Sequence, residues 1–187
     1  MAISVGWAVK LLGDGYSEPV ALLCGLGFSL LMAAIAGVMV AYVEIPALFA
    51  TLAMATFIYG FGHFQLVTSD LVYLPGNVGF LGIFGMNSFF NVPNSILAFA
   101  ALCLLASLFL RYTRIGKFIY AIGDNYLAAR ITGIAARPLV VLQYVLAGAI
   151  GFFAGIILVT TVTSMDTRIA NSTLIYDVFK DNNDRPP

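Results

Sequence analysis

Four long apolar segments, almost free of charge, place the strongest limit on how this chain can fold. They run over residues 19–43, 46–67, 94–110 and 138–162. An α-helix needs about 20 residues to cross the ~30 Å hydrocarbon layer of a bilayer, so three segments are ample and 94–110 is marginal. Hydrophobic residues make up 61% of the chain, charged residues 10%, and the mean hydropathy is +0.97, too apolar a balance for a soluble domain. We therefore predict an all-α, polytopic helical membrane protein.

The positive charges gather in one segment between the third and fourth apolar segments. Five of the nine Lys and Arg residues lie within residues 111–137, and none separates Lys10 from that loop. Basic residues close to short membrane spans stay on the cytoplasmic side. The loop 111–137 is therefore predicted to be cytoplasmic, and the spans alternate in direction from it. This alternation puts Glu44 on the cytoplasmic side and residues 68–93 and 163–187 outside.

One transmembrane domain is predicted over residues 1–180, followed by a polar, disordered tail at 181–187. Residues 1–18 are apolar but interrupted by charge, so they form either a partial or re-entrant helix or the tail of a span whose beginning is absent. The stretch 70–93 is apolar, broken by glycines and too short to cross. We expect it to form a re-entrant or interfacial lid over the outer end of the bundle.

Small residues recur at every fourth position through the first span. They are Gly25, Ser29, Ala33, Gly37 and Ala41, and Ala147, Gly151 and Gly155 repeat the spacing in the fourth span. In lipid, helices associate through close backbone approach and van der Waals packing, which such stripes permit. We therefore predict that these faces pack against other helices.

Polar side chains inside the apolar segments are few, and they cluster toward the outer end of the second span. Tyr59 and His63 share one helix face, and Gln65 is displaced from it. Such groups can stack on and hydrogen-bond a polar solute in a substrate pathway, or they can anchor the helix at the membrane interface. The residues leave both interpretations open.

The residue patterns that carry enzymatic chemistry are missing from the sequence. It holds no HExxH, CxxC or GxSxG pattern, and Gly116-Lys117 lacks the rest of a phosphate-binding loop. His63 is the only histidine, which excludes a multi-histidine metal site within the chain, and Cys24 and Cys103 are predicted to be small buried thiols. We expect no enzyme activity, no cofactor and no metal, and with zero net charge no nucleic-acid partner.

A short amphipathic helix is predicted inside the basic loop, with Asp124 as its N-cap. Its apolar face consists of Leu127, Ile131 and Ile134. Arg130 and Arg137 share another face. A helix of this kind can lie on the membrane surface or fit a groove on a partner protein, and the spacing alone does not choose between them.

Three stretches of the chain resemble the permeases of ribose-type bacterial ABC importers. Residues 118–134 read Phe-Ile-Tyr-Ala-Ile-Gly-Asp-Asn-Tyr-Leu-Ala-Ala-Arg-Ile-Thr-Gly-Ile, similar to the family's Tyr-Ala-Ile-Gly-Gly-Asn followed by Glu-Ala-Ala-Arg-Leu-Ser-Gly-Ile. Residues 43–52 resemble the family's Val-Pro-Pro-Phe-Ile-Ala-Thr-Leu, and residues 3–6 resemble the end of its Gly-Ile-Asp-Leu-Ser-Val-Gly. The motifs occur in the family's order and cover most of the chain.

The resemblance implies the membrane-spanning permease subunit of an ATP-driven importer in the bacterial inner membrane. Two permease chains form the pathway in the lipid, a periplasmic solute-binding protein delivers a monosaccharide or similar small polar solute, and cytoplasmic ABC ATPases supply the energy. The resemblance also implies a cytoplasmic coupling helix that docks in a groove of the ATPase. Its ATPase-facing residues in this chain are Asn125, Ala128, Ala129, Arg130, Gly133 and Ile134.

Several positions depart from the family's pattern. Leu127 replaces an acidic residue expected before the two alanines, Asp124 replaces a glycine, and Lys117 replaces an arginine. Because family permeases are longer, the chain is expected to be truncated at both ends, and a transport-incompetent membrane fragment or structural subunit is the second hypothesis. A secondary transporter is the third, but it requires intramembrane ionisable residues and an inverted repeat that the sequence does not show. Sugar, purine nucleoside and signalling-molecule permeases share these motifs, so the solute stays open.

Overall fold

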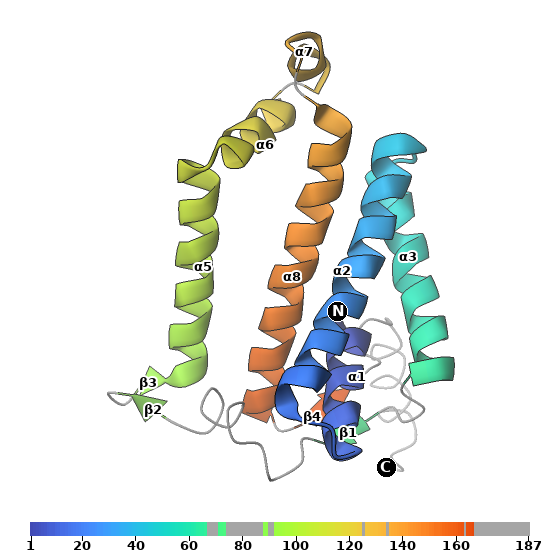
Figure 1. Cartoon of the computed structure of the whole chain (residues 1–187), viewed down its shortest axis with the longest axis vertical. Coiled ribbons are helices and arrows are strands. Elements are labelled where there is room, and N and C mark those ends of the chain that lie inside the picture. The colour runs from blue at the N-terminus through green and yellow to red at the C-terminus, as the bar shows by residue number, and fades with distance from the viewer. Residues whose placement is uncertain are drawn as a thin grey trace, which may run out of the picture.

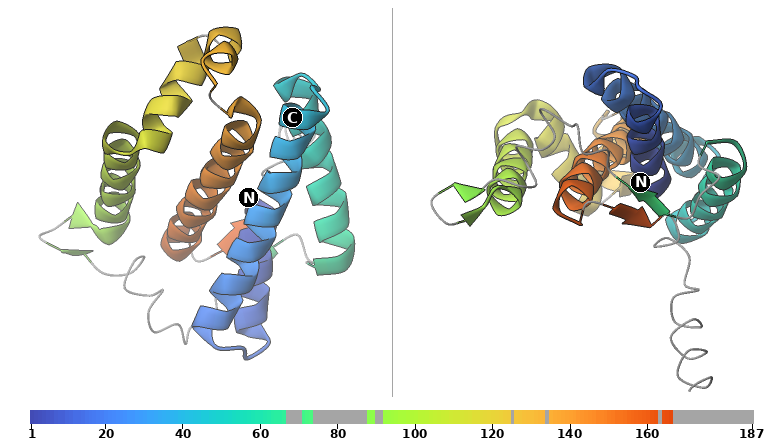
Figure 2. Two further views of the ribbon diagram at one scale, coloured as in Figure 1. Left: turned by 45° about the horizontal axis from the view of Figure 1, so that its top comes forward. Right: turned by 90° about the horizontal axis from the view of Figure 1, so that it is seen from below.

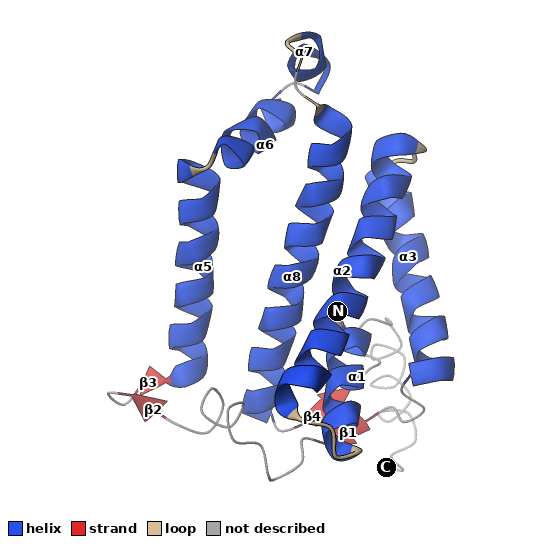
Figure 3. Ribbon diagram, in the orientation of Figure 1, coloured by secondary structure: helices blue, strands red, loops and turns tan. Residues whose placement is uncertain are grey.

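Helices make up most of the part of the chain that the structure describes (Figures 1 and 3). The computed structural model describes residues 1–66, 71–73, 88–89, 92–124, 126–133, 135–162 and 164–166. The helices are α1 (Ala2–Gly13), α2 (Glu18–Tyr42), α3 (Ala47–Phe61) with a π-helical turn η1 (Gly62–Leu66), α5 (Asn94–Tyr112), α6 (Arg114–Asp124), α7 (Tyr126–Ile131) and α8 (Ala136–Val162). The short strands are β1 (Leu71–Tyr73), β2 (Ser88–Phe89), β3 (Val92–Pro93) and β4 (Ser164–Asp166). The predicted tail, most of the predicted lid, Asn125 and Ile134 lie outside the described residues.

Among the residues that the structure describes, four helices are long and apolar enough to cross a membrane: α2, α3 with η1, α5 and α8. The predicted fold class, an all-α multi-pass membrane protein, is therefore confirmed. Helix α5 has 19 residues, so at ~1.5 Å per residue it comes close to the ~30 Å that a span requires. Helix α8 begins at Ala136, ahead of Pro138, because a proline in the first helical turn removes only an N–H that has no intrahelical partner.

The two ends of the bundle are built differently (Figure 1). The α2–α3 connection and helices α6 and α7 lie at one end, which we call the loop end. The strands lie at the opposite end, which we call the sheet end; there β1 pairs antiparallel with β4, and β2 with β3. The α2–α3 connection, which holds Glu44, therefore shares an end with α6 and α7, as alternating spans require, and residues 71–73 share the other end with 164–166.

The main apolar core lies where α1 packs against both α2 and α8, in the half of the bundle nearer the sheet end (Figure 2). Its buried members are Val5, Ala8, Val9, Leu12, Ala21, Phe152, Ile156 and Val159. The N-terminal segment, which the sequence left ambiguous, is thus a helix packed into the bundle. Lys10 fixes its far end, because its Nζ donates a hydrogen bond to the carbonyl oxygen of Leu66 at 2.9 Å. Leu66 is the last residue of η1, so its carbonyl oxygen is one of those at a helix end that accept no hydrogen bond from the same helix.

Helix α5 stands apart from this core. None of its residues is buried, and Leu97, Phe99, Leu104 and Leu105 are exposed. It connects to the bundle mainly through α6 and the facing side of α8. An apolar helix with this much free surface is stable only where its surroundings are also apolar, as in lipid or against other helices.

The structure corrects three expectations from the sequence. Residues 114–124 form a helix of their own, so Asp124 is the last residue of α6 and does not cap the start of α7. Helix α7 ends at Ile131, so Arg137 belongs to α8 and shares no helix face with Arg130. Cys24 and Cys103, predicted to be buried, are exposed. Apolar residues need no protein cover when lipid is the solvent, so an apolar run alone does not say which of its positions face inward.

Candidate functional site

The candidate site is the pair of short helices α6 and α7 that joins α5 to α8 at the loop end (Figure 1). Thr113 makes the first corner. Its hydroxyl donates to the carbonyl oxygen of Phe109 at 2.7 Å and accepts a hydrogen bond from the backbone N–H of Gly116 at 3.0 Å. The second bond is that of a helix N-cap, which satisfies one of the free N–H groups of the first turn of α6. A side chain at Gly116 would overlap the backbone of Leu110, so the turn out of the span is tight.

Helix α7 is attached to the bundle by a small apolar cluster. Ile122 of α6, Ala129 of α7 and Ala136 of α8 are buried together, with Leu139 and Val140 packed against them. Ala129 is only 5% exposed. The structure therefore places Ala129 on the inner side of α7, where it packs against α6 and α8.

Gly133 makes the corner between α7 and α8. Its φ is +84°, a left-handed conformation that other L-residues adopt only at a cost of roughly 1 kcal/mol, although no atom lies within 4 Å of the place that a Cβ would take. The hydroxyl of Thr132 donates to the carbonyl oxygen of Ala129 at 2.9 Å and closes the end of α7. The glycine is thus required for the direction of the chain, while space around it is open.

The outward side of α7 carries apolar surface. Ile131 is 79% exposed, and Tyr126 at the start of the helix is also exposed. Helix α7 projects beyond the ends of the spans (Figure 1). The side chains of Leu127, Ala128 and Arg130 are not among those described. Exposed apolar surface on a projecting helix is typical of a protein contact site.

An ion pair links the start of α8 to the α2–α3 connection. Arg137 Nη2 lies 3.2 Å from Glu44 Oε1, and the Arg137 guanidinium lies over the ring of Tyr42 at 5.8 Å from its centroid. Glu44 has a φ of +60°, uncommon for a residue with a side chain. Both partners of the pair are exposed, so it stabilises the fold by at most about 1 kcal/mol. Its importance is geometric, because it connects two segments 93 positions apart in the chain.

The small-residue stripe of α2 lies on the buried face of that helix. Gly25, Ser29, Ala33, Gly37 and Ala41 are all buried. A Cβ at Gly25 would meet Ala8 and Phe152, and one at Gly37 would meet the backbone of Val141. The stripe therefore runs from the α1 contact near the sheet end to the α8 contact near the loop end.

The corresponding face of α8 differs from the predicted one by one position. Gly148 is buried and would place a Cβ 2.7 Å from that of Ala33, whereas Ala147 is exposed. Gly151 and Gly155 face α1, where added side chains would meet Met1 and Val5. The Ser29 hydroxyl donates to the carbonyl oxygen of Gly148 at 3.1 Å, so a polar contact accompanies the close approach of α2 and α8.

The three candidate substrate-pathway residues lie at the end of α3 and in η1. The rings of Tyr59 and His63 are stacked, with centroids 5.8 Å apart and planes 6° apart, while Gln65 is exposed. The structure thus brings Tyr59 and His63 together and leaves Gln65 apart from them. Among the described residues, no three His, Cys, Asp or Glu side chains gather as a metal site would require.

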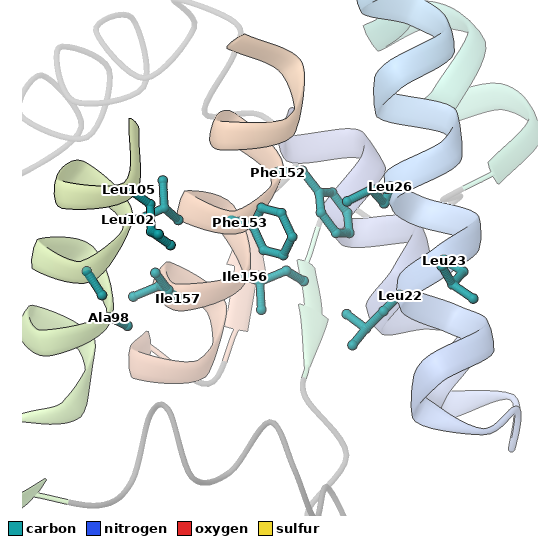
Figure 4. A pocket seen from close by; sticks show the side chains of 11 residues that line it. Leu22, Leu23, Leu26, Ala98, Leu102, Leu105, Phe152, Phe153, Ile156 and Ile157 are labelled. Carbon is teal, nitrogen blue, oxygen red and sulfur yellow. The ribbon is translucent and has the colours of Figure 1, made fainter. Parts of the chain in front are cut away.

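Two apolar cavities flank α5. One of about 510 Å³ lies between α2, α5 and α8, lined by residues such as Leu26, Leu102 and Phe153 (Figure 4). The other, of about 420 Å³, lies between α5, α6 and α8. Hydroxyl groups buried in such apolar surroundings would lose their hydrogen bonds, so these cavities suit hydrocarbon and not a polar solute.

The chain is similar to known membrane transport proteins over almost its whole length. Residues 1–180 match the family described as branched-chain amino acid transport system / permease component. The chain is 32% identical over 179 residues to the galactofuranose transporter permease protein of Escherichia coli, covering 96% of this chain and 52% of that protein. It is 31% identical to the ribose import permease protein of Escherichia coli, covering 88% of this chain and 51% of that protein.

A more distant relative is the fructose import permease protein of Rhizobium meliloti, at 27% identity over 81% of this chain and 43% of that protein. The chain therefore spans about half the length of the relatives it matches. No solved structure matches it significantly.

Proposed function

The chain belongs to the family of permease components of branched-chain amino acid transport systems, and on that premise we propose that it is a membrane-spanning permease subunit of an ATP-driven importer. Its cargo is a monosaccharide or a similar small polar solute, because the relatives are named for galactofuranose, ribose and fructose. ATP hydrolysis takes place on a separate cytoplasmic subunit. The loop end faces the cytoplasm of a bacterial inner membrane, because the basic residues gather there.

The observation that carries this proposal is the projection of α7 beyond the spans, with Ile131 exposed on it. The ATPase contacts this tip, and the resemblance adds Asn125, Ala128, Arg130 and Ile134 to the residues proposed for that contact. Ala129 supports it from within, since it packs against Ile122 and Ala136. Gly133 serves as the turn that holds α7 at its angle to α8.

The route from the ATPase to the spans follows the contacts of α8. Helix α8 begins at Ala136, three positions after Gly133, and its Arg137 pairs with Glu44 in the α2–α3 connection. Along its length α8 packs closely on α2 at Gly37 and Gly148. A displacement of α7 would thus reach α2, α3 and α8 together, which is what alternating access by a permease dimer requires.

The solute path is proposed at the Tyr59–His63 ring pair. Stacked aromatic rings can bind the apolar faces of a sugar ring, and Gln65 can add a hydrogen bond where the solute enters. A periplasmic solute-binding protein delivers the solute at the sheet end. A second permease chain completes the pathway.

Co-purification in detergent tests the ATPase contact. The full chain is co-expressed with the ATPase subunit of a bacterial ribose importer, and the amount of ATPase retained is measured. Ile131→Asp puts a charge at the exposed tip and is expected to reduce retention about tenfold or more, as loss of an interface hot spot does. Tyr16→Asp is the matched control, because Tyr16 is equally an exposed apolar residue but lies in the α1–α2 turn at the sheet end.

The results separate the alternatives clearly. Retention by the wild type and the Tyr16 variant, with loss in the Ile131 variant, supports docking at α7. If the wild type retains no ATPase from several sugar importers, the coupling role fails. Equal loss in both variants would point to a general folding defect, which circular dichroism of the purified variants identifies.

A further inference from the structure

Helix α6 presents a basic face that the proposed ATPase contact does not use. Arg111 lies in the last turn of α5, and Arg114 and Lys117 follow on α6 within two turns. All three side chains are exposed. Within the described residues none of the three has a salt-bridge or hydrogen-bond partner for its side chain. The cluster therefore has a free positive charge at the loop end.

The surroundings of this cluster are those of a membrane interface. Tyr112 and Tyr120 are 73% and 62% exposed beside it, and Tyr42 is exposed at the end of α2 at the same end of the bundle. Tyrosines with exposed rings are enriched where the hydrocarbon of a bilayer meets the headgroups. Helix α7 projects farther from the spans, and α6 lies between the end of α5 and α7 (Figure 1).

The other face of α6 is apolar and only partly covered. Ile122 is buried and Ile119 is half-buried, but Ile115 and Phe118 are exposed. At 100° per residue, Phe118 and Ile115 lie on the side of the helix next to Arg114. A helix with exposed apolar side chains beside exposed cations matches a surface that offers hydrocarbon and negative charge together.

We infer that α6 with Arg111 is a binding surface for anionic phospholipid headgroups, with phosphatidylglycerol as the type ligand. Charge complementarity favours this occupant, because the three cations face a layer of phosphodiesters at the depth where α5 ends. The apolar side chains Ile115 and Phe118 contact the acyl chains, and Tyr120 lies at the headgroup level. This surface is independent of the proposed ATPase contact on α7.

Quenching of a single tryptophan by brominated lipid tests the inference. Trp7 is the only tryptophan. In a Trp7→Phe background, Tyr120→Trp reports on lipid at α6, and Leu97→Trp reports on lipid at the sheet end of α5, where Leu97 is exposed. The full chain is reconstituted in phosphatidylcholine vesicles containing either brominated phosphatidylglycerol or brominated phosphatidylcholine. The ratio of the two quenching curves gives the relative association constant.

We expect the reporter at position 120 to prefer phosphatidylglycerol by several fold and the reporter at 97 to show a ratio near one. Each neutralised cation should weaken the preference by about fivefold at most, the factor that corresponds to roughly 1 kcal/mol per basic residue at a membrane surface. A variant with Arg111→Gln, Arg114→Gln and Lys117→Gln should therefore lose it. A matched variant with Arg111→Lys, Arg114→Lys and Lys117→Arg keeps the charge and should keep the preference.

Two outcomes would overturn the inference. One is a ratio near one at position 120 in the wild-type charge background. The other is a preference that survives in the triple glutamine variant, which would assign it to other residues. If the wild-type background shows no preference and the glutamine variant loses ATPase retention, the cations serve the ATPase and not the lipid. Unchanged helicity of both triple variants excludes misfolding as the cause of any loss.

Discussion

The packing of α1, α2 and α8 can be tested at a single position, Gly25. This glycine lies where the three helices meet, and a Cβ built on it would lie 2.8 Å from the Cβ of Ala8, 2.9 Å from Cε2 of Phe152 and 2.9 Å from the carbonyl oxygen of Ser4. Carbon atoms in favourable contact lie about 3.5–4.0 Å apart, so a methyl group is too close on three sides. Because Ala8 and Ser4 meet it through atoms on or next to the backbone, α1 must move to admit the methyl group.

The expected cost of Gly25→Ala follows from a comparison within the same helix. Gly27 lies two residues further along α2 and has nothing within 4 Å of a Cβ position. Alanine improves the helix propensity of either site by about 0.5–1 kcal/mol, and this gain cancels when the two variants are compared. The free energies of unfolding of the two variants should then differ only by the cost of overpacking at Gly25, about 1–3 kcal/mol.

The assay is equilibrium unfolding of the full chain in mixed micelles with increasing SDS, followed by circular dichroism. Trp7 supplies a second signal, because its ring packs edge-on against Phe28 of α2 at 5.7 Å between centroids. We expect Gly25→Ala to unfold at lower SDS than Gly27→Ala, and its Trp7 emission to change before helicity is lost. If the two variants unfold at the same SDS fraction, or if Gly27→Ala is the less stable, the packing of α1 against α2 and α8 is refuted.

Three further predictions concern the α2–α8 contact, the ion pair at the loop end and the topology. Ser29→Ala removes the hydrogen bond to the Gly148 carbonyl and should destabilise the fold by about 1 kcal/mol in SDS unfolding. Thr56→Ala is the control and should change the free energy of unfolding little, because the exposed Thr56 hydroxyl donates only to the carbonyl of Leu52 in its own helix. Glu44→Gln breaks the ion pair with Arg137 and should cost under about 1 kcal/mol, since both side chains are exposed; a larger loss would contradict the surface character of this pair. In a cysteine-free background, Asp14→Cys should react with an impermeant maleimide added to intact cells, whereas Asp124→Cys should react only after permeabilisation. The reverse pattern would invert the topology.

Much of the fold follows from the residues of each segment taken alone. Apolar length predicts the four spans, and the bounds of α2 and α5 lie within a few residues of those predicted. The family resemblance rested on residues 3–6, 43–52 and 118–134, and the match over residues 1–180 confirms it. Charge placement groups Glu44 with the basic loop 111–137, and the structure has the α2–α3 connection at the loop end together with α6 and α7.

Helix α6 was missed, although the sequence carries its signals. Thr113 can cap a helix, and Ile115, Phe118, Ile119 and Ile122 follow at helical spacing. The glycines at 116 and 123 and the three basic residues made the segment look like a plain loop. A polar cap followed by apolar residues at i, i+3, i+4 and i+7 is a stronger local signal than glycine content.

The sequence alone determined the class of the protein, the length of its spans, the faces that small side chains occupy and the end of the bundle that carries positive charge. It could do so because length, periodicity and charge are properties of single segments. Which surface meets which depends on contacts between distant segments. The structure puts α1 against the stripe of α2, buries Gly148 in place of Ala147, and turns Ala129 inward. In lipid every span is apolar on all sides, so hydrophobicity does not distinguish a buried face from an exposed one. Only the fit between helix surfaces distinguishes a buried face from an exposed one. This fit depends on two helices at once, so the sequence of one segment does not reveal it.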